Sequence, residues 1–178
     1  MLIKIILIGL ALSMDAFAVT LSSAFIYPDL KGNKRLCMPV AFGAFQGIMP
    51  ILGYFLGTIF SDFINAYSSI ISFAILVAIG ANMLHDGIKG EEFEQKCFSV
   101  KVLLALALAT SIDAFAVGVS FAAIGAEIFT SSGVIALSTF ILTLMALKLG
   151  NYVGEKLGDK SVIVGGIILI LIGIKSLF

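Results

Sequence analysis

Two aspartates stand in matching surroundings, far apart in a chain that is otherwise poor in charge. Asp15 lies in the segment Ser13-Met-Asp-Ala-Phe-Ala-Val-Thr-Leu-Ser-Ser-Ala24, and Asp113 lies in Ser111-Ile-Asp-Ala-Phe-Ala-Val-Gly-Val-Ser-Phe-Ala122. Eight of these twelve positions are identical. Two carboxylates balance the charge of one dication, and oxygen ligands suit hard cations such as Mg²⁺, Ca²⁺ and Mn²⁺. The pair therefore predicts a site for a divalent cation.

Neutral oxygen ligands could complete such a site. Ser13 and Ser111 stand two residues before the aspartates and could add hydroxyl oxygens. Pro50 cannot donate to the carbonyl four residues earlier, so Gln46 would offer a freed backbone oxygen as well as its side-chain amide. We expect the metal ligands to be Asp15, Asp113, Gln46, Ser13 and Ser111. The alternatives are helix-to-helix hydrogen bonding by protonated aspartates, and a proline kink that a serine or water satisfies.

A second polar group falls near the end of an apolar run and could form an entrance or gate. It consists of Asn82, His85 and Asp86. Solvated residues at a helix end are the simpler interpretation. His85 is the single histidine of the chain and has no evident nucleophile partner, so the sequence does not indicate an enzyme.

The composition predicts that lipid is the natural solvent of this chain. Of its 178 residues, 60% are hydrophobic and only 12% are charged, and the mean hydropathy is +1.15. Soluble domains carry about 25% charged residues. The net charge is zero, which gives no indication of a nucleic-acid partner.

Apolar runs of about 20 residues are long enough to cross a bilayer. They predict an all-α integral membrane protein with six transmembrane helices, at Leu2–Ile26, Pro39–Phe60, Tyr67–Gly87, Lys101–Gly125, Gly133–Gly150 and Val162–Phe178. Each aspartate would lie about 18–20 Å from the end of its helix, close to the bilayer midplane. A charged carboxylate costs about 2.5–3.5 kcal/mol there, which marks a functional position.

Lysine and arginine predict the orientation of the chain in the membrane. The loops after the first, third and fifth spans hold nine of these residues, whereas the opposite side holds only Lys4 and Lys175. Cytoplasmic loops are the ones enriched in positive charge. We therefore expect a multi-pass protein with both termini outside the cytoplasm.

The similarity of the two aspartate segments continues weakly into the spans that follow them. Leu52-Gly-Tyr-Phe-Leu-Gly57 resembles Leu149-Gly-Asn-Tyr-Val-Gly154, and Ile79-Gly80 resembles Ile172-Gly173. Residues 1–88 and 101–178 are therefore predicted to be two three-helix repeats of one membrane domain. Because three is odd, the repeats would have inverted topology, which suits alternating access around a central site. Duplication of a packing module without transport is the alternative.

The same pattern suggests how transport would be driven. Two carboxylates close together in a low dielectric cannot both ionise cheaply, and we expect no permanently cationic side chain nearby, so metal binding would displace a proton. No GxxxxGK[ST] motif is present, which disfavours direct use of ATP. No cofactor is expected, because the metal would be the transported substrate. A homo-oligomer is compatible with the sequence.

Four motifs resemble the MntP family of manganese efflux pumps, which is similar in fold to the LysE-type exporters. They are the two aspartate segments, Phe42-Gly-Ala-Phe-Gln-Gly-Ile-Met-Pro50 and Gly165-Gly-Ile-Ile-Leu-Ile-Leu-Ile-Gly173. The resemblance implies a secondary transporter that exports Mn²⁺ across the inner membrane of a bacterium, with Asp15 and Asp113 as functional aspartates. Gln46 and Val162 stand where some relatives carry Glu. An exporter of another metal or of an amino acid, and a non-transport scaffold, are the alternatives.

Overall fold

The computed structural model describes residues 2–26, 33–89, 99–157, 160–175 and 177. This part of the chain is almost entirely helical and includes no strand, which confirms the all-α prediction. The helices are α1 (Leu2–Ile26), α2 (Asn33–Lys89), α3 (Val100–Ala123), α4 (Ile128–Leu157) and α5 (Ser161–Lys175). Within the described residues, four helical stretches are long and apolar enough to cross a membrane, and two shorter apolar stretches span Ser69–His85 and Val162–Lys175.

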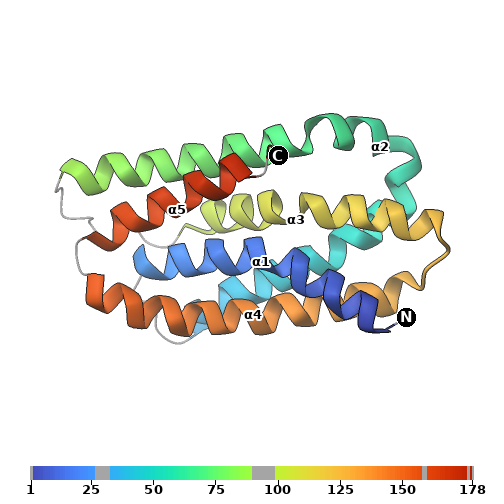
Figure 1. Ribbon diagram of the computed structural model, residues 1–178, viewed down its shortest axis with the longest axis horizontal. Coiled ribbons are helices and arrows are strands. Elements are labelled where there is room, and N and C mark those ends of the chain that lie inside the picture. Colours follow the sequence, from blue (N-terminus) through green and yellow to red (C-terminus); the bar gives the residue numbers. More distant parts are fainter. Residues whose placement is uncertain (1, 27–32, 90–98, 158–159, 176, 178) are drawn as a thin grey trace.

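Helix α2 contains two of the expected spans and doubles back on itself. Pro50 of α2 lies against Gly118 of α3, and Ser72, which is 22 residues further along α2, donates a hydrogen bond to Ala109 of α3. In a straight helix Pro50 and Ser72 would be about 33 Å apart, whereas Ala109 and Gly118 are separated by about 14 Å along α3. Figure 1 shows the corresponding reversal of α2 at one end of the bundle.

The expected boundary within this region differs from the observed one. The sequence predicts one helix ending at Phe60 and another beginning at Tyr67, but α2 is helical from Asn33 to Lys89. Residues 58–79 contain neither Gly nor Pro, so no residue type there interrupts the backbone hydrogen bonds of a helix. The chain therefore turns through a bent helix instead of a loop.

The first and fourth helices pack side by side. Gly9 of α1 lies against Ser138 of α4, and Gly150 of α4 lies against Leu21 and Ala24 of α1. The residue numbers of the contacts rise together, so α1 and α4 run parallel. Glycine at these positions lets the two backbones approach closely, as small residues do between membrane helices.

The later part of α2 packs antiparallel to α5. Gly80 lies against the carbonyl of Gly166, and at the other end of this interface Gly173 lies against Phe73. Residue numbers fall in α5 as they rise in α2. Figure 1 shows these two helices adjacent along one side of the bundle, where α5 ends about half-way along α2.

The interior of the bundle is rich in small polar side chains, and the exterior is apolar. Buried polar residues include Ser13, Thr20, Gln46, Ser111, Thr139 and Thr143. Exposed apolar residues include Ile3, Leu7, Met14, Leu104, Leu137 and Ile141. In lipid, polar side chains must find partners inside the protein while apolar ones can face the acyl chains. This distribution is that of a helical membrane protein.

Candidate cation site

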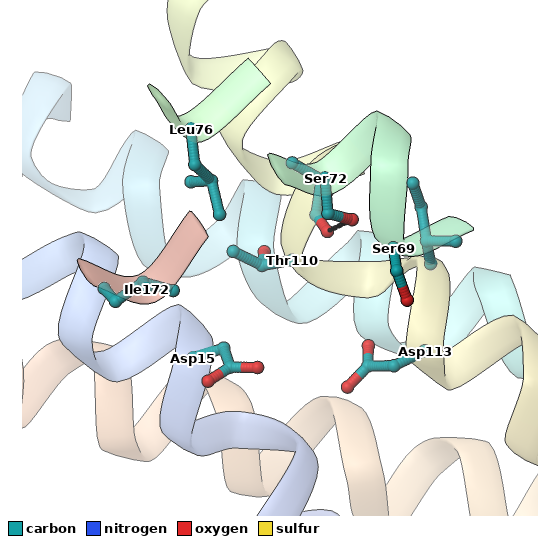
Figure 2. A pocket seen from close by; sticks show the side chains of 9 residues that line it. Asp15, Ser69, Ser72, Leu76, Thr110, Asp113 and Ile172 are labelled. Atoms are coloured by element: carbon teal, nitrogen blue, oxygen red, sulfur yellow. Dashed lines mark hydrogen bonds between the residues drawn. The ribbon is translucent and has the colours of Figure 1, made fainter. Parts of the chain in front are cut away.

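Asp15 of α1 and Asp113 of α3 line the same cavity. Each aspartate is the fourteenth residue of its helix, so both lie near the middle of the bundle. Figure 2 shows the two carboxylates turned toward a common space from separate helices. The cavity has a volume of about 130 Å³, which leaves room for a cation together with water ligands.

Three hydroxyl side chains that the sequence analysis did not single out also line this cavity: Ser69 and Ser72 of α2, and Thr110 of α3. The hydroxyl of Ser72 donates to the carbonyl of Ala109 at 2.8 Å, and that of Thr110 donates to Leu106 at 3.0 Å. Because each hydrogen is directed at a carbonyl, the lone pairs of these oxygens remain available to a cation.

A weak sequence signal for these residues existed. Ser69 and Ser72 are three residues apart and therefore share one face of an apolar helix, and Thr110 immediately precedes the second aspartate motif. In Figure 2 the Ser69 hydroxyl points toward Asp113. The cavity therefore has an oxygen-rich lining that comes from α1, α2 and α3, with Ile172 of α5 closing one side.

Ser13 and Ser111 are buried but are not among the residues that line the cavity. The Ser13 hydroxyl donates to the carbonyl of Gly9 at 2.5 Å and shares a 2.8 Å hydrogen bond with Thr139 of α4. The Ser111 hydroxyl donates to the carbonyl of Ala107 at 2.7 Å. Two residues along a helix correspond to a rotation of about 200°, so a serine two positions before an aspartate faces away from it.

Gln46 is fully buried between the two aspartate helices. Its side-chain Nε2 donates to the carbonyl of Thr110 at 2.8 Å and to that of Leu12 at 3.4 Å, while its Oε1 has no partner within the described part of the chain. Leu12 and Thr110 are equivalent, because each stands one residue before the serine of its motif. Gln46 therefore links the same point of α1 and α3, beside the cavity but not in its lining.

Replacing Gln46 with Met should lower the free energy of unfolding by about 1–3 kcal/mol, because the buried hydrogen bonds that join α1 and α3 through the Gln46 amide are lost. Thermal unfolding of the purified protein in detergent measures the effect. The control is Thr143→Val. Thr143 is equally buried and occupies the corresponding position of α4, but its hydroxyl donates within its own helix, to Thr139. Equal shifts for both variants would mean that the link between α1 and α3 contributes nothing particular.

The expectation that no permanent cation lies near the aspartates is wrong. The Nζ atom of Lys175 is 3.0 Å from Oδ1 of Asp15. The sequence extends the last span to Phe178 and so places Lys175 at the outer surface, but α5 ends at Lys175 after 15 residues, a length of about 22 Å. A helix this short does not cross a hydrocarbon core of about 30 Å, and it delivers its last residue to the depth of Asp15.

The predicted gate residues lie elsewhere. Asn82 and His85 are exposed on the later part of α2, and of Asp86 only its place in that helix is described. Neither Asn82 nor His85 lines the cavity that holds the aspartates. Their role as an entrance stays a prediction. Over the described ranges, no group of three or more His, Cys, Asp or Glu side chains is placed to hold a metal ion, so the donors are two carboxylates and neutral oxygens.

An apolar exterior, helices long enough to cross a bilayer and an acidic cavity inside the bundle define a multi-pass helical membrane protein. The profile of a family described as "Putative manganese efflux pump" matches residues 29–177. The chain belongs to this family, the MntP family, which confirms the resemblance found in the sequence.

Relatives from several organisms match over almost the full length. A protein of Methanobrevibacter smithii is 42% identical over 177 residues, covering 99% of this chain and 96% of the relative. One from Ruminiclostridium cellulolyticum is 44% identical over 178 residues, covering 98% and 94%. Both are named "Putative manganese efflux pump MntP". No solved structure matches the chain.

Proposed function

We propose that this protein is a secondary transporter that exports Mn²⁺ across the cytoplasmic membrane, the inner membrane of a bacterium. The observation that carries the proposal is the convergence of Asp15 and Asp113, from equivalent motifs, on one cavity. Manganese efflux is the activity in the names of relatives that are about 40% identical over nearly the whole chain. Carboxylate and hydroxyl oxygens suit Mn²⁺, and the activity needs no enzymatic chemistry and no resident cofactor.

The cargo ion would be held by the two carboxylates, with Ser69, Ser72 and Thr110 as neutral oxygen ligands. Two negative charges neutralise one dication in the low dielectric of the bundle. A transported ion must also leave, so a site with few charged ligands suits its task better than a closed cage of carboxylates. The sequence suggests Gln46, Ser13 and Ser111 as ligands. Gln46 and Ser13 would instead hold in place the helices that carry the aspartates, and the Ser111 hydroxyl bonds within α3.

We propose six helical membrane segments, of which α5 is the short last one, arranged as two inverted three-helix repeats, residues 1–88 and 101–178. The doubled-back α2 supplies the second and third spans. The packing supports this arrangement, because the first helix of each repeat lies against the second helix of the other: α1 against α4, and α3 against the first part of α2. Gly80 and Gly173 occupy equivalent positions of the two repeats, and so do Phe73 and Gly166. The contact of Gly80 with Gly166 therefore corresponds to the contact of Gly173 with Phe73.

Inverted repeats around a central site support alternating access, in which one half rocks against the other and opens the cavity to one side at a time. With the positively charged loops in the cytoplasm, α1 would begin outside and α5 would be directed toward the same side. Mn²⁺ binds carboxylates in their ionised form, so its binding displaces any proton that Asp15 or Asp113 carries, and exchange with protons is the proposed source of energy.

Uptake of Mn²⁺ into inverted membrane vesicles that contain this protein tests the function. We expect saturable uptake that other divalent cations reduce in proportion to their affinity, and acceleration by a proton gradient directed out of the vesicle. Vesicles without the protein provide the background. Uptake equal to that background would support a scaffold, and flux that ignores the proton gradient would count against proton exchange alone.

A further inference from the structure

We propose that Lys175 is a tethered cation that occupies the Asp15 carboxylate when the cavity is empty and is displaced by the exported dication. The inference rests on the proposed function and adds to it a competitor that is built into the chain. It starts from the ion pair between Lys175 Nζ and Asp15 Oδ1, which are 3.0 Å apart. An ionisable side chain at this depth of a membrane protein points to function more than to surface solvation.

The end of α5 is positioned for this role. Ile172 lines the cavity, and Lys175 follows it by three residues, so both side chains lie on the same face of α5. Lys175 is also the last residue of the helix, where the carbonyl ends favour a cation. The ammonium is thus held at the edge of the cavity by a helix that ends there.

The pair is accessible enough to open. The side chain of Lys175 is 71% exposed and that of Asp15 is 35% exposed. The lysine side chain is therefore not packed in the core and is free to move away from Asp15. By contrast, Asp113 accepts a hydrogen bond from the backbone N–H of Ala114 at 2.8 Å, which holds its carboxylate in place. A cation entering the cavity meets one fixed carboxylate and one whose partner can swing away.

Charge decides that the lysine and the metal ion exclude each other. The two ionised carboxylates carry −2, and the ammonium reduces this to −1. A bound dication alone brings the cavity to zero, but a dication together with the ammonium would leave +1 in a low dielectric. Repulsion between the two cations and their demand for the same carboxylate both oppose joint occupancy.

This competition assists export. When the dication leaves, Lys175 takes its place at Asp15 and hinders rebinding. The same ion pair halves the net charge of the empty cavity. The empty carrier must then change conformation inside the membrane, and a smaller charge makes this step easier. The lysine therefore weakens binding of the cargo but speeds its release and the return of the empty carrier.

The test is equilibrium binding of Mn²⁺ to the purified full-length protein, followed by loss of the electron paramagnetic resonance signal of free hydrated Mn²⁺. Lys175→Met should bind Mn²⁺ about tenfold more tightly than the unaltered chain, because a partly exposed ion pair and the repulsion between cations no longer oppose binding. Lys175→Arg keeps the charge and should bind as the unaltered chain does. Lys4→Met removes a lysine far from the cavity and serves as the matched control.

Transport kinetics give an independent measurement. In vesicles, Lys175→Met should lower both the Mn²⁺ concentration for half-maximal flux and the maximal flux, since tighter binding slows release. Lys175→Gln takes the place of Lys175→Met if the latter does not fold. Binding to both neutral variants that is no tighter than in the unaltered chain would overturn the proposal for Lys175 and leave export standing. Absence of Mn²⁺ binding to the unaltered chain would instead remove the proposed function.

Discussion

Asp113→Asn and Asp15→Asn will abolish Mn²⁺ export and leave the protein in the membrane. Each substitution removes one of the two negative charges that face the cargo ion and keeps the shape of the side chain. Removing one partner of a buried ionic interaction typically costs about 3–5 kcal/mol, so Mn²⁺ affinity should fall by more than about 100-fold. Neutral Asn also costs less to hold in the bilayer than ionised Asp, so insertion should not suffer.

The two substitutions do not change the cavity in the same way. Asp15→Asn also removes the partner of Lys175 and leaves an ammonium beside the cavity, whereas Asp113→Asn changes the charge without breaking that ion pair. Asp113→Asn is therefore the cleaner variant, and Asp15→Asn should bind Mn²⁺ more weakly still. Adding Lys175→Met to Asp15→Asn should recover part of the affinity but not transport.

The measurement is rescue of manganese-sensitive cells that lack their own exporter, with membrane levels of each variant determined in parallel. Glu127→Gln is the control, because Glu127 is an exposed carboxylate at the start of α4 that contacts Thr130 and lies outside the cavity. It should rescue fully. Rescue by Asp113→Asn at normal membrane levels would exclude the cavity as the transport site.

The aspartate pair could be predicted from the sequence because its signal is internal to the chain. A costly residue type appears twice, in one motif, at the same position of two apolar runs. The bounds of α1 were also predicted as observed, Leu2–Ile26, because the apolar run and the helix coincide. Where a repeated motif supplies the evidence, no knowledge of tertiary contacts is needed.

Ligands that depend on helix rotation were harder to predict. Ser13 and Ser111 belong to the repeated motif and so attract attention, yet Ser13 hydrogen-bonds to Thr139 of α4 and Ser111 to the backbone of its own helix. Ser69 and Ser72 line the cavity but look like ordinary helical serines, which commonly hydrogen-bond to the backbone of their own helix. Which face of a helix meets a cavity is decided by its neighbours, and an apolar run alone does not define those neighbours.

Lys175 could not be placed from the sequence because the apolar run continues past it through Leu177 and Phe178. Hydropathy alone therefore extends the last span and puts the lysine at the membrane surface. The pairing with Asp15, 160 residues away, depends on where α5 ends relative to α1. The inverted topology of the repeats and the orientation of the termini likewise stay predictions, because both are defined relative to the membrane.

Gly118→Ala should destabilise the protein strongly. At the crossing of α2 and α3, a Cβ atom on Gly118 would overlap the carbonyl oxygen of Pro50, and one on Gly53 would overlap that of Phe115. Both obstacles are backbone atoms, which cannot rotate away as a side chain can. The helices must move apart, and we expect a loss of about 3 kcal/mol or more in the free energy of unfolding.

Gly53→Ala should have a similar effect, because its contact is the reciprocal one at the same crossing. Gly133→Ala is the matched control: Gly133 lies in α4 with no atom within 4 Å of an added Cβ, so the methyl group should be neutral or mildly stabilising there. Thermal unfolding in detergent compares the three variants.

The crossing lies within two turns of Asp113, so separating α2 from α3 also displaces a cargo ligand. Gly118→Ala should therefore lose Mn²⁺ binding even where it folds. A variant that melts and binds like the unaltered chain would show that the two backbones are not in contact.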